Sequence, residues 1–150
     1  MSNNTRIKSK LPGVLRIEPA AACNLACSHC PTGTVRMARG IMEDAVFSRV
    51  IEAIDRNRTS VRVVVLYHGG EPLLNKRFPD MVRRVKESGI PFVKAVSNGM
   101  HMPRNLIREL VDCGLDAIEF SIDGESAEIN NLVRRNADFD RVVENVKALV

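Results

Sequence analysis

Aromatic residues are scarce in this chain of 150 residues, which has no Trp, one Tyr and five Phe. Modules that bind RNA by stacking bases on aromatic rings depend on such residues, so the composition argues against that class. A strong excess of one charge is also missing, since 22 basic and 18 acidic residues give a formal charge of +4. Arg6, Lys8 and Lys10 supply +3 of this charge from a leader without acidic residues. The remainder is nearly neutral, so no nucleic-acid-binding surface is predicted.

Long apolar runs are missing as well. The longest strongly apolar stretch, 63–67, is far shorter than a membrane-spanning helix. No apolar segment follows the basic residues of the N-terminus, as a secretion signal requires. We therefore expect a cytoplasmic protein that does not enter a membrane. In that reducing compartment the four cysteines are metal ligands, reactive thiols or core residues rather than disulfides.

Short apolar runs alternate with amphipathic stretches along the chain. Four runs of strand length precede turn-forming residues and cover 14–18, 61–67, 92–96 and 117–122. The helical spacing of apolar residues predicts four helices, over 46–54, 78–85, 106–111 and 139–149. This alternation predicts an α/β fold with a parallel sheet and helices outside it.

The segment 20–40 makes the first strand-to-helix connection longer than the others. It follows a strand, so it is expected at the carboxyl edge of the sheet, where α/β folds carry their chemistry. Cys23, Cys27 and Cys30 stand in it with the spacing C-x3-C-x2-C. Three thiols in one loop predict an inorganic centre, because thiolates are the ligands of iron–sulfur clusters and of zinc.

Two kinds of centre compete for these thiols. An iron–sulfur cluster held by three thiolates keeps one iron open to a ligand other than the protein. Zinc would take a fourth ligand, and His29 lies between two of the cysteines. The second Cys or His pair typical of a zinc module is missing, however. The spacing favours the cluster, with zinc and plain core cysteines as the alternatives.

Short motifs also follow the other three predicted strands. They read Gly69-Gly70-Glu71-Pro72, Ser97-Asn98-Gly99 and Ser121-Ile122-Asp123-Gly124. With the cysteine motif, and in this order, they resemble the motifs of the radical S-adenosylmethionine (radical SAM) superfamily over residues 13–150. Arg134 is similar to the basic residue that often follows the fourth motif. The wording of the first two motifs is similar to the SPASM/maturase-like branch, which includes peptide maturases and sulfatase activators.

The resemblance implies a partial (β/α) TIM-like barrel. Six βα units are usual in the family and four are visible here, so we expect a radical SAM core at 13–150 that is incomplete at its C-terminal end. Residues 1–12 are expected to form a flexible basic leader. A non-catalytic zinc-binding interaction module and an inactive truncated fragment are the alternatives to an active enzyme.

The resemblance also implies a chemistry. Cys23, Cys27 and Cys30 would hold a [4Fe-4S] cluster whose open iron binds S-adenosylmethionine (SAM). Reductive cleavage of SAM would give a 5′-deoxyadenosyl radical that takes a hydrogen atom from the substrate. Such an oxidoreductase, similar to the maturases, requires an electron donor such as flavodoxin or ferredoxin. We expect a peptide or a small molecule as substrate, and neither nucleic acid nor membrane as partner.

Cofactor-binding roles follow from the resemblance for residues at the strand ends. They are Gly69, Gly70, Glu71, Ser97, Asn98, Ser121 and Arg134. Glycine lets the backbone approach a ligand closely, and a guanidinium group fits the SAM carboxylate with two hydrogen bonds. His68 is the candidate catalytic residue, and no other is assigned. His29 stands where the family usually has an aromatic residue, and we expect it to pack against the cluster, with a hydrogen bond near the cluster as the alternative.

Overall fold

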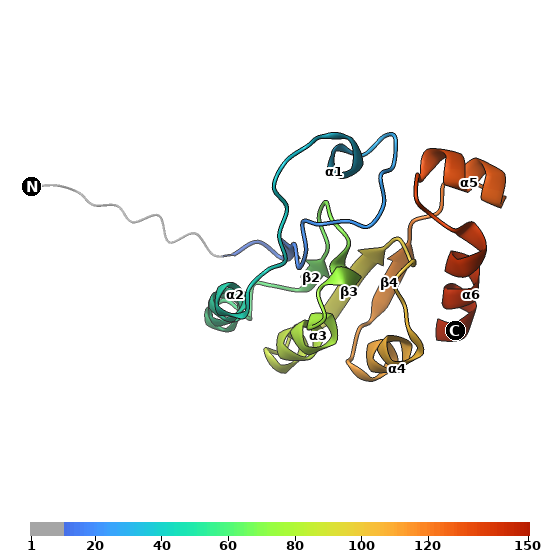
Figure 1. Ribbon diagram of the computed structural model, residues 1–150. Helices are drawn as coiled ribbons and strands as arrows, with labels where there is room; N and C mark the ends of the chain where they lie inside the picture. Colours follow the sequence, from blue (N-terminus) through green and yellow to red (C-terminus); the bar gives the residue numbers. More distant parts are fainter. Residues whose placement is uncertain (1–10) are drawn as a thin grey trace, which may run out of the picture.

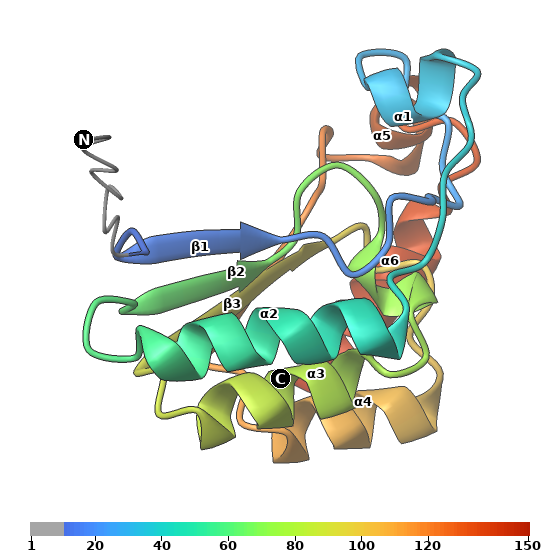
Figure 2. The same cartoon turned by 90° about the vertical axis from the view of Figure 1, so that its left-hand side faces the viewer.

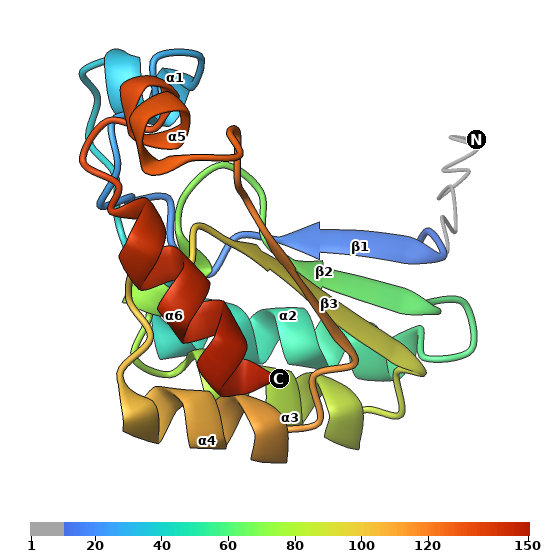
Figure 3. The ribbon, with the colours of Figure 1, turned by 90° about the vertical axis from the view of Figure 1, so that its right-hand side faces the viewer.

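The computed structural model describes residues 11–150. Its four parallel strands form one sheet in the order β1-β2-β3-β4, and they run Val14–Ile17, Val63–Leu66, Phe92–Ser97 and Ala117–Phe120. Helices α2 (Asp44–Arg56), α3 (Phe78–Glu87) and α4 (Arg104–Asp112) cover one face of this sheet (Figure 1 and Figure 2). Helix α6 (Phe139–Leu149) packs against α4 (Figure 3).

The core lies between the sheet and helices α2 to α4. Val64 and Val93 of neighbouring strands are fully buried in it, and so are Phe47 of α2 and Phe78 of α3. Burying a side chain of this size contributes about 1.5–3 kcal/mol, so the apolar stripe of each helix is drawn onto the sheet. This layer determines which face of the sheet the helices cover.

The strand register brings all four carboxyl ends to one edge of the sheet. Ile17 of β1 is level with Leu66 of β2, and Ser97 of β3 is level with Phe120 of β4. Helices α1 (Pro31–Thr34) and α5 (Ala127–Val133) lie beyond this edge (Figure 2 and Figure 3). The predicted motifs therefore leave the sheet on the same side.

The predicted α/β fold is confirmed, and each expected strand and helix is found within a few residues of its predicted range. Three short elements were not predicted, namely α1, α5 and a 3-10 helix, η1 (Pro72–Leu74). Both α1 and η1 are too short to show a periodic pattern. Helix α5 has no apolar stripe, because Ile129 and Leu132 are exposed and its buried residue is Asn130.

The sheet is open between β1 and β4 within residues 11–150, as the partial-barrel prediction requires. Residues 1–10 of the predicted leader lie outside the described residues, and the incompleteness of the core stays a prediction. Across the part of the chain that is described, no helix combines the length and the apolar character needed to cross a bilayer.

Candidate functional site: a cysteine-lined pocket at the carboxyl edge

The three cysteines lie on a loop that leaves the end of β1 and returns to its starting point. An antiparallel bridge between Ala20 and Ile41 closes the neck of this loop, and the Ala21 N–H donates to the Gly40 carbonyl at 2.9 Å. We call residues 20–41 the cysteine loop. It includes α1 and extends beyond the carboxyl ends of the strands (Figure 1).

The far side of the cysteine loop pairs with the chain that follows α5. The Ala26 N–H donates to the Arg135 carbonyl at 3.0 Å, and the Ser28 N–H donates to the Val133 carbonyl at 3.0 Å. Gly33 approaches the same turn so closely that a Cβ would lie 2.7 Å from backbone atoms of Ala26. Backbone contacts on both sides therefore fix the shape of the loop.

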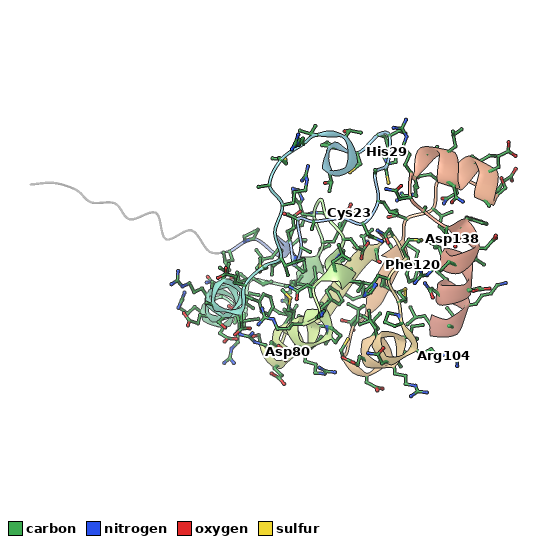
Figure 4. The ribbon with its side chains drawn as sticks, in the orientation of Figure 1. Cys23, His29, Asp80, Arg104, Phe120 and Asp138 are labelled. Atoms are coloured by element: carbon green, nitrogen blue, oxygen red, sulfur yellow. The ribbon has the colours of Figure 1, made fainter. Side chains whose placement is uncertain are left out.

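The three thiols line one pocket under this loop. Cys27 is buried, whereas Cys23 and Cys30 are half-buried; Figure 4 labels Cys23 between the loop and the sheet. The Leu25 N–H and the Asn98 amide donate to Sγ of Cys23 at 3.4 and 3.7 Å. Burial raises the pKa of the Cys23 and Cys27 thiols. A bound cation would offset this effect, because the thiolate is the form that binds metal.

Cys30 loses its proton more readily than an ordinary thiol. Burial acts to raise its pKa, but the backbone and hydroxyl of Thr32, the backbone of Gly33 and the charge of Arg39 outweigh it and lower the pKa overall. Cys30 immediately precedes α1, which begins at Pro31. The polar groups of that turn therefore favour the thiolate of the third cysteine.

The donor set fits a cluster better than a single ion. Within residues 11–150, no three His, Cys, Asp or Glu side chains converge closely enough to hold one metal ion. His29 is exposed at the edge of the same pocket, and its Nε2 lies 3.8 Å from Oδ2 of Asp123. In a [4Fe-4S] cluster each thiolate binds a different iron, so three thiols spread over one pocket fit it, whereas structural zinc requires four ligands around one point.

The two glycines after β2 lie against the cysteine loop and line the pocket. A Cβ on Gly70 would lie 2.0 Å from the Ala20 carbonyl oxygen, so only glycine fits there. The Gly69 N–H donates to Oε1 of Glu18 at 2.7 Å, and the Gly69 carbonyl accepts from the Thr32 hydroxyl at 2.8 Å. The sequence predicted that the glycine backbone approaches a ligand closely. In the structure it makes this close approach to the end of β1 and to the cysteine loop.

Glu71 joins the ends of β2 and β3. It is 2% exposed, and its carboxylate accepts hydrogen bonds from the Leu73 N–H at 3.0 Å, the Ser97 hydroxyl at 2.9 Å and the Asn98 N–H at 2.7 Å. Burial raises its pKa although these donors oppose the shift. Glu71 lines the pocket with one acceptor position left, whereas Ser97 faces Glu71 and is not among the lining residues.

Asn98, Ser121 and Arg134 line the same pocket. The Nε of Arg134 lies 2.8 Å from Oδ2 of Asp123, as an ion pair without hydrogen-bond geometry. Asp123 therefore orients this arginine. Asn98 donates to the Asn24 side chain at 2.8 Å, which ties β3 to the cysteine loop.

His68 is exposed and is not among the residues that line the pocket, and its catalytic role stays a prediction. Tyr67, which the sequence analysis did not single out, does line it, and burial raises the pKa of its phenol. A usable signal was present, because Tyr67 is the only tyrosine and stands just before the glycine motif. Glu18 and Thr32 gave no such signal.

Comparison with known proteins assigns a family to this arrangement. The profile of the radical SAM superfamily matches residues 17–150. The GTP 3′,8-cyclase of Chlorobaculum tepidum is 29% identical, over 91% of this chain and 40% of its own length. The mycofactocin maturase MftC of Mycobacterium tuberculosis is 27% identical, over 92% of this chain and 34% of its own. The chain therefore spans less than half the length of these relatives.

Solved structures agree on the fold. The structure of anSMEcpe with bound AdoMet and a Cp18Cys peptide is similar with a TM-score of 0.74 at 22% identity, over 93% of this chain and 40% of that one. The matched profile covers all the strand-end motifs and every thiol of the pocket. The chain belongs to the radical SAM superfamily.

Proposed function

We propose that residues 13–150 form the core of a radical SAM enzyme in which Cys23, Cys27 and Cys30 hold a [4Fe-4S] cluster and SAM binds in the same pocket. The observation that carries the proposal is that the thiols share one pocket with residues from the ends of β2, β3 and β4. When bound, the cluster supplies an open iron for SAM and the electron that splits SAM into methionine and a 5′-deoxyadenosyl radical.

The chain's own residues orient the cofactors and stabilise their charges. The Leu25 N–H and the Asn98 amide stabilise the Cys23 thiolate, as outer hydrogen bonds do at metal sites. Tyr67 and Leu25 contribute apolar surface that keeps water from the reacting atoms. The remaining acceptor position of the Glu71 carboxylate suits an ammonium group such as that of SAM.

Arg134 is the residue proposed to bind the SAM carboxylate. Its Nε is engaged by Asp123, while its terminal nitrogens donate no hydrogen bond within the described residues. We expect Arg134→Ala to weaken SAM binding about tenfold to a hundredfold, because a hydrogen bond to a charged group contributes about 1.5–3 kcal/mol. The dissociation constant of SAM, measured anaerobically on the reconstituted protein by calorimetry, checks this.

Arg135→Ala is the matched control. Its side chain is exposed, and its contact with the cysteine loop uses the backbone carbonyl, which the substitution keeps. The control should bind SAM like the wild type. If Arg134→Ala binds SAM with unchanged affinity, Arg134 has no role in SAM recognition.

The proposal itself is tested by anaerobic reconstitution with iron and sulfide. We expect about four irons and four sulfides per chain, from the composition of the cluster, and an EPR signal of the reduced protein that shifts when SAM is added. Methionine and 5′-deoxyadenosine should form in the same tube once a reductant is present. A chain that binds zinc in preference and forms no cluster would instead be an interaction module, and a cluster that ignores SAM would mark an inactive fragment.

The substrate is proposed to be a peptide or a small molecule. The anSMEcpe structure contains a peptide, and the Chlorobaculum tepidum relative is named for a nucleotide cyclisation. These two classes are separated by comparing how peptide pools and nucleotides stimulate deoxyadenosine formation. We propose flavodoxin or ferredoxin as the electron donor, to be tested against dithionite in the same assay.

A further inference from the structure

The peptide group of Gly69 is held on both sides by side chains that lie far from it in the sequence. Its N–H donates to Oε1 of Glu18 at 2.7 Å, and Glu18 directly follows β1. Its carbonyl accepts from the hydroxyl of Thr32 at 2.8 Å, and Thr32 belongs to α1 of the cysteine loop. One peptide therefore connects the end of β1, the end of β2 and the cysteine loop.

Thr32 also lies beside the third thiol. It stands two residues after Cys30, in the turn whose polar groups lower the pKa of that thiol. The hydroxyl has one hydrogen, which is donated to the Gly69 carbonyl, so this bond ties the turn that carries Cys30 to the glycine loop. The contact is half-buried, where a lost hydrogen bond costs more than at an exposed position.

We infer that Thr32, with Glu18, is a positioning residue that locks the turn of Cys30 onto the Gly69 peptide, so that the third cluster ligand and the glycine loop move as one unit. The inference rests on the proposed function for its consequence at the cluster, but the contact itself is a property of the folded chain. Neither side chain belongs to the motifs that identify the family.

The chain supplies a matched set of variants. Thr32→Val keeps the shape of the side chain and removes the hydroxyl, whereas Thr32→Ser keeps the hydroxyl. Thr34→Val is the control, because the Thr34 hydroxyl donates to the Cys30 carbonyl at 2.9 Å within the same turn and makes no contact with the glycine loop. Glu18→Gln keeps an acceptor oxygen for the Gly69 N–H, and Glu18→Ala removes it.

The first measurement needs no cofactor. Hydrogen exchange of the apo protein, followed by mass spectrometry, should show faster exchange over residues 67–71 in Thr32→Val and in Glu18→Ala. Thr32→Ser, Glu18→Gln and Thr34→Val should exchange like the wild type. The double variant Thr32→Val/Glu18→Ala should fall short of the sum of the single effects, because both act on one peptide group. Unchanged exchange in Thr32→Val would overturn the lock.

The second measurement uses the reconstituted protein. Thr32→Val should shift the midpoint potential of the cluster, because the turn that carries its third ligand is no longer held against the glycine loop, and it should weaken SAM binding about tenfold, the lower end of the range for outer-shell groups. Thr34→Val should change neither quantity. If Thr32→Val has the midpoint potential and the SAM affinity of the wild type, the inference is wrong, whereas the proposed function is unaffected. If the wild type forms no cluster, the proposed function is wrong. The hydrogen-exchange experiment would still show whether Thr32 and Glu18 hold the Gly69 peptide in place.

Discussion

Replacing Cys27 with serine is expected to abolish cluster binding and, with it, all SAM cleavage. Cys27 is the most deeply buried of the three pocket thiols, at 7% exposed, and no fourth cysteine lines the pocket to replace it. A serine hydroxyl does not ionise in the physiological range and is a poor ligand for iron, so two thiolates would remain for a cluster that uses three. Iron and sulfide content after anaerobic reconstitution, and deoxyadenosine formation, should fall to background.

Cys113→Ser is the control for the same chemical change elsewhere in the chain. Cys113 is buried at the end of α4, where its Sγ contacts the Leu110 carbonyl at 3.3 Å, and it does not line the pocket. This variant should keep its iron, its sulfide and its activity while losing about 1 kcal/mol of stability, as a typical buried substitution does. Wild-type iron content in Cys27→Ser, or loss of iron in Cys113→Ser, would refute the ligand assignment.

The strands and the four longer helices could be read from the sequence because their apolar residues repeat with the period of the element. Helix α5 could not, because it contributes Ile129 and Leu132 to the surface rather than a stripe to the core. The backbone of its C-terminal end pairs with the cysteine loop instead. Such pairing depends on main-chain groups that every residue has, so it leaves no mark in the sequence.

The residues of the pocket also divide into those that the sequence predicted and those that it did not. The cysteines were predicted from their spacing and the glycines from the family resemblance, and the structure gathers them in one pocket. The role of Glu71 as the link between β2 and β3 was not predicted, because its partner Ser97 is 26 residues away. Glu18 and Thr32 meet at Gly69 across 51 and 37 residues, a proximity that only the folded chain creates.

Glu71→Ala is expected to be the most destabilising single substitution at the site. The carboxylate is the shared acceptor of the Leu73 N–H, the Ser97 hydroxyl and the Asn98 N–H, in a position that is 2% exposed. Removing it leaves buried donors without partners, at about 1–3 kcal/mol each, so we expect a total loss of about 3 kcal/mol or more. Urea unfolding of the apo protein, followed by circular dichroism, measures this loss.

Glu119→Ala serves as the control for removing a glutamate from the sheet. Glu119 lies on β4, exposed, and forms a surface ion pair with Lys94, so its removal should cost less than about 1 kcal/mol. The stability loss of Glu71→Gln should lie between those of Glu71→Ala and Glu119→Ala. One acceptor oxygen remains in the glutamine, but its amide group adds a donor where other donors already point. A Glu71→Ala variant as stable as Glu119→Ala would show that Glu71 does not hold the strand ends together.

The pH dependence of this difference follows from the environment of Glu71. Burial raises its pKa in the folded chain above the ordinary value of 4.5. Between 4.5 and the raised value the native state binds more protons than the unfolded state, so the free energy of unfolding falls as pH rises through this window.

Glu71→Gln cannot titrate there, and comparison with it cancels the contribution of the other carboxylates. The stability advantage of the wild type over Glu71→Gln should therefore be largest below pH 4.5 and should shrink as pH increases. An advantage that grows with pH would mean that the three donors outweigh burial and hold the carboxylate ionised.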